Sequence, residues 1–135
     1  MASLLSRLHR PALGYHLLRI SVAALMLFHG AAKLSNGIDG IQAMLASAGL
    51  PAFIAYGVYA GELIAPLLVL LGIFVAPAAL VMAANMVFAV GLAHLAQVFT
   101  LGKSGGWAIE LQALFFIASL AVAFLAPAPR ERFRG

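Results

Sequence analysis

The chain contains no cysteine and very few charged residues. Only 9% of its 135 residues are charged, and only four of them are Asp or Glu. Without cysteine there can be no disulfide framework, no thiolate metal site and no thiol redox couple, so redox chemistry would need a bound cofactor or a partner. The chain is 64% hydrophobic, with a mean hydropathy of +1.07, which is far from the composition of a soluble domain. The composition therefore predicts an integral membrane protein.

The formal net charge of +4 could suggest nucleic acid as a partner. However, most basic residues lie near the two ends, beside apolar segments, and form no patch with interleaved aromatics. We therefore expect the lipid bilayer, and no nucleic acid, as the partner.

Four apolar segments predict an all-α, integral membrane four-helix bundle. They cover residues 15–34, 52–71, 78–98 and 107–126. Segments of about 20 residues span the roughly 30 Å hydrocarbon core as helices. The predicted organisation is a basic N-terminal lead (1–14), a transmembrane domain (15–126) and a basic C-terminal tail (127–135). A signal peptide is the alternative for the first segment, because small residues follow its apolar run, but no soluble domain follows.

Residues 35–49 are too short and too polar to cross a membrane. Their apolar residues recur at helical spacing after Asp39, a candidate N-cap. This pattern predicts a short amphipathic helix in the membrane interface between the first two spans.

The basic residues predict the orientation. With both termini cytoplasmic, six arginines face that side and Lys33 and Lys103 face the other. In this orientation His29, His94 and Glu110 lie about 4–8 Å below the outer boundary, at 1.5 Å per residue. Glu62 and Asn85 lie deeper, at a level similar to each other.

Ionisable residues at membrane depth normally face the bundle interior and pair. We therefore expect Lys33 to pair with Glu110, and Arg19 to reach toward Glu62. Pro66 cannot donate to the carbonyl of Glu62, so a kink is expected beside that carboxylate.

Gly57 and Gly61 form a GxxxG pair in the second segment. Such a pair lets another helix approach closely, and it could support a homo-oligomer. Chance is an equal explanation in an alanine-rich chain.

Several of these residues together resemble the DoxX family of small four-helix membrane proteins. They are Arg19, His29, Gly30, Lys33, Leu34, Gly49, Leu50, Pro51, Glu62, Gly72, His94 and Glu110. The resemblance extends from about Leu18 to Leu125, and its most distinctive part is the His-Gly-x-x-Lys-Leu run with the later Glu. The chain departs from the pattern at Ala65 and Pro66. The resemblance implies a multi-pass protein of the bacterial inner membrane with a redox-associated role.

The functional hypothesis is a site for a quinone or another small redox ligand in the outer half of the bundle. The candidate proton-exchanging, catalytic residues are Glu62, Glu110 and His29, and the candidate ligand-binding residues are His29, Lys33, His94, Tyr59 and Trp107. Whether the protein is an enzyme stays open. One alternative is a metal site built from the histidines and a carboxylate. The other is a non-catalytic membrane subunit that anchors a soluble oxidoreductase.

Overall fold

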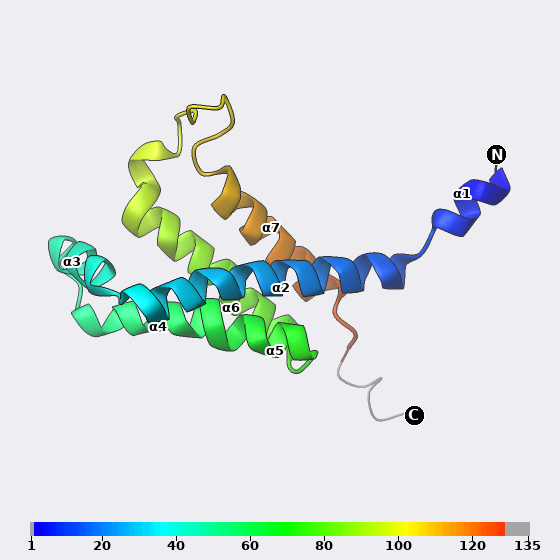
Figure 1. Cartoon of the computed structure of the whole chain (residues 1–135), viewed down its shortest axis with the longest axis horizontal. Helices are drawn as coiled ribbons and strands as arrows, with labels where there is room; N and C mark the ends of the chain where they lie inside the picture. The colour runs from blue at the N-terminus through cyan, green and yellow to red at the C-terminus, as the bar shows by residue number, and fades with distance from the viewer. Residues whose placement is uncertain (1, 129–135) are drawn as a thin grey trace.

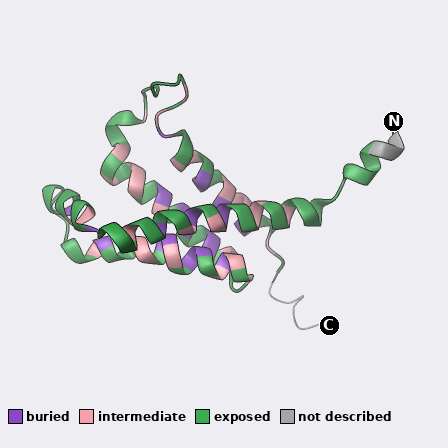
Figure 2. Cartoon of the chain, in the orientation of Figure 1, coloured by how far each residue is buried: buried purple, intermediate pink, exposed green. Residues whose placement is uncertain are grey.

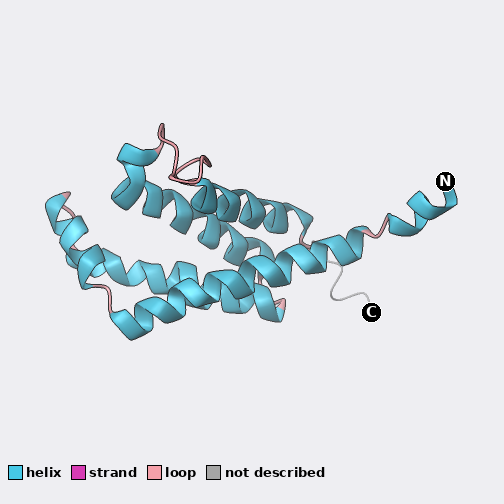
Figure 3. Cartoon of the chain, turned by 45° about the horizontal axis from the view of Figure 1, so that its top comes forward, coloured by secondary structure: helices cyan, strands magenta, loops and turns pink. Residues whose placement is uncertain are grey.

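The computed structural model describes residues 2–128, and this part of the chain is helical apart from its loops and one isolated bridge between Leu101 and Trp107 (Figures 1 and 3). Most of the predicted C-terminal tail, residues 129–135, lies outside the described residues. The helical elements are α1 (Ala2–Leu8), α2 (Pro11–Asn36), α3 (Asp39–Ser47), η1 (Ala52–Tyr56), α4 (Gly57–Tyr59), η2 (Ala60–Ile64), α5 (Ala65–Leu71), α6 (Val75–Ala89), η3 (Val90–His94), η4 (Leu95–Gln97) and α7 (Glu110–Leu125).

Three helical segments are long and apolar enough to cross a membrane. They are Leu5–Asn36, Ala52–Leu71 and Val75–Gln97. The second has the predicted bounds, and the third begins three residues earlier than predicted. The fourth apolar helix, α7, has 16 residues and covers only about 24 Å at 1.5 Å per residue. It begins at Glu110 rather than at position 107, because Trp107 belongs to the preceding loop.

The three long segments and α7 pack in a ring. α2 contacts α5 and α7, and α6 contacts the same two helices from the other side (Figure 3). The buried core between them is built from Met26, Val69, Met82 and Val122. Many large apolar side chains are exposed, as expected for helices surrounded by lipid. Buried residues lie where the helices face one another, and exposed residues lie on their outer faces (Figure 2). α1 points away from this bundle (Figure 1).

The predicted helix between the first two long segments is present as α3. It packs on η1, with Leu45 and Ala55 in a small second core. Asp39 was expected to be the N-cap, which is wrong by one residue, because Ile38 holds that position and Asp39 is the first helical residue. A carboxylate in the first turn still interacts favourably with the helix dipole.

The segment Ala52–Leu71 is irregular where its acidic residue lies. Residues Ala60–Ile64 form a π-helix, in which the Ala65 N–H donates to the Ala60 carbonyl. Pro66 follows directly and has no N–H for the carbonyl of Glu62. Glu62 therefore lies in a π-helical turn, a feature that is frequent at functional sites. The kink expected beside it stays a prediction.

Candidate functional site

Glu62 lies at the centre of a polar cluster inside the bundle. Its Oε2 is 2.5 Å from Lys33 Nζ on α2, and its Oε1 accepts a hydrogen bond of 3.1 Å from Asn85 Nδ2 on α6. The Glu62 side chain is only 5% exposed, whereas that of Lys33 is 28% exposed. Each carboxylate oxygen thus has a donor from a different helix, which satisfies the buried charge. The predicted similar depth of Glu62 and Asn85 is confirmed.

Two glycines allow the backbones to approach at this cluster. A Cβ on Gly30 would lie 2.3 Å from the carbonyl oxygen of Glu62, and a Cβ on Gly61 would lie 2.5 Å from Asn85 Cβ. Such distances are far too short for real atoms, so only glycine fits at both positions. Lys33 and Asn85 can reach the carboxylate because their helices are this close to η2.

Tyr59 joins the cluster through the backbone. Its hydroxyl donates to the carbonyl of Lys33 at 3.3 Å. The Lys33 ammonium has three hydrogens and makes one hydrogen bond within the described residues, so two donors are left for a ligand. Asn85 Nδ2 likewise has one hydrogen beyond the one given to Glu62.

Both ion pairs expected from the sequence are wrong. Lys33 pairs with Glu62 and not with Glu110, and within the described residues this is the one ion pair. Arg19 does not reach Glu62. Its Nη1 donates to the carbonyls of Val69 and Leu70 at the end of α5, where cations are favoured by the helix dipole.

The structure does not bring His29, His94 and Glu110 into this cluster. His29 is exposed and stacks edge-on against Phe115 of α7, with ring centroids 5.5 Å apart. His94 Nδ1 lies 3.0 Å from Gln97 Oε1 on its own segment. Glu110 is exposed, and its carboxylate lies close to Gly106 of the preceding loop. The three residues therefore have separate local partners, and their functional roles stay predictions.

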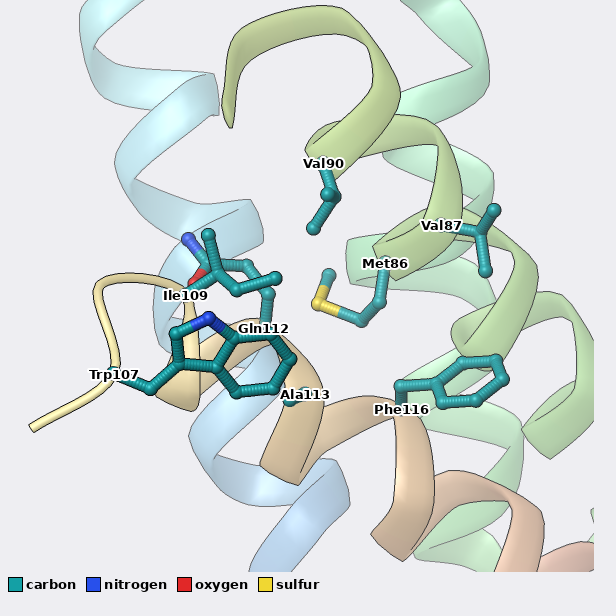
Figure 4. Close-up of a pocket in the computed structure, with 8 residues that line it drawn as sticks. All are labelled: Met86, Val87, Val90, Trp107, Ile109, Gln112, Ala113 and Phe116. Carbon is teal, nitrogen blue, oxygen red and sulfur yellow. The ribbon is translucent and has the colours of Figure 1, made fainter. Parts of the chain in front are cut away.

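Trp107 lines an apolar pocket of about 230 Å³ between α6, η3 and α7 (Figure 4). Its indole N–H donates to the Val98 carbonyl at 2.6 Å, which ties the two ends of the loop together. The other lining residues are Met86, Val87, Val90, Ile109, Gln112, Ala113 and Phe116. None of them belongs to the Glu62 cluster, so Trp107 and the cluster are at different places in the bundle.

The metal-site alternative gains no geometric support. Residues 2–128 contain no group of three or more His, Asp or Glu placed to hold a metal ion.

The comparisons with known proteins assign the family. The family model described as DoxX matches residues 14–95. The chain belongs to the DoxX family. The DoxX match runs from the start of α2 to η4 and includes Lys33, Glu62 and Asn85. No match was found among curated proteins or among solved structures.

The sequence placed Asn85 at the level of Glu62 and indicated it only for a proton or small-solute path along Glu62 and Asn85, not for the ligand site. Asn85 is the only residue with a polar side chain in α6 of this DoxX protein, so a lone amide in an apolar span was the available signal. The positioning role of Gly30 had no such signal, since its neighbour Glu62 comes from another helix.

Proposed function

We propose that the cluster of Lys33, Glu62 and Asn85 binds the carbonyl headgroup of a lipid-soluble quinone, and that the protein acts in a redox reaction of the bacterial inner membrane. The proposal rests on one observation, the buried Glu62 carboxylate that pairs with the partly exposed Lys33 through one oxygen and accepts from Asn85 through the other. Ionisable groups at membrane depth are costly and are a default indication of function.

The charge of the cluster favours a neutral ligand. Lys33 and Glu62 compensate each other, so an anion would gain little from the ammonium and would lose its hydration. A quinone is neutral, dissolves in the bilayer and presents carbonyl acceptors to the spare hydrogens of Lys33 and Asn85. Lys33 and Glu62 are groups that can donate and accept a proton near a ligand oxygen.

Electrons for a quinone reaction would come from a bound cofactor or from an oxidoreductase partner, because the chain has no thiol pair of its own. Glu110, His29, His94 and Trp107 lie outside this cluster, so their functional roles stay separate predictions, as does a homo-oligomer through Gly57 and Gly61. Gly61 already packs against Asn85 within the chain, so a second copy would meet mainly Gly57.

The membrane arrangement that we propose has four spans, with both termini cytoplasmic and α3 in the outer interface. α7 packs antiparallel along α6, so it crosses the bilayer in the opposite direction (Figure 1). Its length of about 24 Å is short for the hydrocarbon core, and local thinning of the bilayer accommodates such a mismatch at modest cost.

Thermal unfolding in detergent with a decyl-substituted benzoquinone tests the proposal. At 100 times Kd, binding would stabilise the protein by about 2.7 kcal/mol. The double variant Lys33→Met/Glu62→Leu removes both charges together and should stay folded but lose this shift. Lys103→Met, a change in an exposed loop, should keep the shift.

His29→Ala completes the test, since His29 lies outside the cluster. If His29→Ala abolishes the shift and the double variant retains it, the site lies between α2 and α7 and the assignment to Glu62 fails. If the wild-type protein shows no shift at all, the quinone proposal itself fails.

A second function, the membrane anchor, is favoured by α1. This helix extends from the bundle (Figure 1), and Arg7 in its last turn and Arg10 in the link to α2 are both exposed, where a soluble protein could contact them. Stoichiometric co-purification of an oxidoreductase that is lost when residues 1–8 are removed would support the anchor function.

A further inference from the structure

A groove on the outside of the bundle leads to the polar cluster. It has a volume of about 340 Å³ and is lined from one side by Ile54, Gly57 and Gly61 and from the α6 side by Val81, Ala84, Asn85 and Phe88. Asn85 is therefore shared by the groove and the cluster. Val81 and Phe88 are 45% and 40% exposed, so the groove opens outward, where these helices would meet lipid.

The absence of two side chains creates the groove. At Gly61 the segment Ala52–Leu71 touches α6, since a Cβ would collide with Asn85. At Gly57, one turn earlier, a Cβ would have nothing within 4 Å. The helices therefore diverge from the contact at Gly61 toward Gly57, and the space between them is left open.

Asn85 supplies the polar end of the groove. Its Nδ2 donates one hydrogen to Glu62 Oε1, and its second hydrogen has no acceptor within the described residues. The other wall residues are apolar or glycine. A ligand in the groove would thus meet apolar walls and a single amide donor, Asn85 Nδ2. The other hydrogen of this amide is bonded to the Glu62 carboxylate.

We infer that this groove is the route by which the quinone reaches the cluster from the bilayer, and that Asn85 Nδ2 donates to one of its carbonyls. The inference rests on the proposed function and specifies which face of the cluster the ligand occupies. The occupant is a neutral ring with carbonyl acceptors, because the groove offers a donor but no free charge. A phospholipid acyl chain would fill the apolar part but would leave the amide hydrogen without an acceptor.

Filling the groove tests the inference. A Cβ at Gly57 would have nothing within 4 Å, and Gly57 has helical dihedral angles (φ −59°, ψ −23°), so Gly57→Leu should fold and place its side chain in the groove. We expect the Kd for the decyl-substituted benzoquinone to rise by about tenfold or more, equivalent to at least about 1.4 kcal/mol. Gly14→Leu is the matched control, because Gly14 is also helical, has nothing within 4 Å and lies outside the groove.

Photolabelling gives a second readout. An azido-substituted benzoquinone should label the peptides that carry Ile54 or Phe88, and Gly57→Leu should prevent this labelling. If Gly57→Leu binds like Gly14→Leu while Lys33→Met/Glu62→Leu loses binding, the groove is overturned and the quinone site stands. If a phospholipid copurifies in the groove and excess quinone does not displace it, the groove holds lipid and the inference is wrong. If wild-type protein binds no quinone, both proposals fail.

Discussion

Lys33 Nζ and Glu62 Oε2 lie 2.5 Å apart although 29 positions separate the two residues in the chain. The contact joins α2 to η2, and Asn85 extends it to α6. One buried carboxylate thereby links three helices. Its loss should affect the stability of the bundle in a way that depends on which partner is removed.

Lys33→Met leaves Glu62 buried without its cation. Removing one partner of a buried pair costs about 3–5 kcal/mol, so we expect a large drop in the unfolding midpoint. Glu62→Leu should cost less, because Lys33 is partly exposed and its long side chain can turn toward the surface. The double variant should be more stable than Lys33→Met alone. Thermal unfolding of the wild type, the two single variants and the double variant in one detergent measures this double-mutant cycle. If the losses of stability in the two single variants add up to the loss in the double variant, a direct pair is contradicted.

Gly30→Ala tests the close approach of α2 and η2. A Cβ at this position collides with the Glu62 carbonyl, so the helices must separate, and overpacking of this kind costs about 1–3 kcal/mol. Gly14→Ala, in the same helix, meets nothing within 4 Å and should be neutral or stabilising by up to about 1 kcal/mol. Equal unfolding midpoints for the two variants would show that α2 does not contact η2 at Gly30.

Arg19→Met should loosen the end of α5. Arg19 donates to the carbonyls of Val69 and Leu70, and hydrogen bonds to charged groups contribute about 1.5–3 kcal/mol. We expect faster amide hydrogen exchange near Gly72 and Ile73, the turn that follows α5, with little change at Glu62. Arg10→Met removes an exposed arginine and serves as the control. Faster exchange spread over the whole bundle would contradict a local capping role.

The sequence predicted the helices well but the side-chain pairs poorly. The bounds of Ala52–Leu71 follow directly from the apolar run and Pro51, since both are local signals. The pairing of Lys33 depended on helix rotation and tilt, which packing at Gly30 and Gly61 determines. Depth alone could not distinguish Glu62 from Glu110 as its partner, because the lysine stem is long enough to reach more than one level.

The same limit explains why the sequence grouped residues to which the structure gives separate contacts. His29 and Lys33 are four residues apart, so they form a polar stripe on one face of α2, yet Lys33 pairs with Glu62 while His29 meets Phe115 of α7. A helix in a bundle has two neighbours, so a polar stripe can serve two interfaces at once. The sequence gives the stripe but not the boundary between those interfaces.

Cysteine labelling can test the proposed orientation, because the chain has no cysteine of its own. Ser6→Cys lies in α1 and Ser104→Cys in the loop before α7, and both positions are exposed. The test uses a maleimide that reaches the periplasm of cells but does not cross their inner membrane. If the termini are cytoplasmic, this reagent should label only Ser104→Cys. Inverted vesicles should give the opposite result. Labelling of both positions from the same side would contradict the predicted topology.

Trp107 is the single tryptophan, so its fluorescence reports the loop before α7 without any substitution. It is 42% exposed, and its indole N–H is bound to the Val98 carbonyl at the start of that loop. An indole in this position belongs at the membrane interface, where amphipathic rings are favoured. Lipids brominated near the headgroup should therefore quench it more strongly than lipids brominated near the chain end. Trp107→Phe should abolish the signal, whereas strongest quenching by the deepest bromines would mean that the loop lies inside the hydrocarbon core.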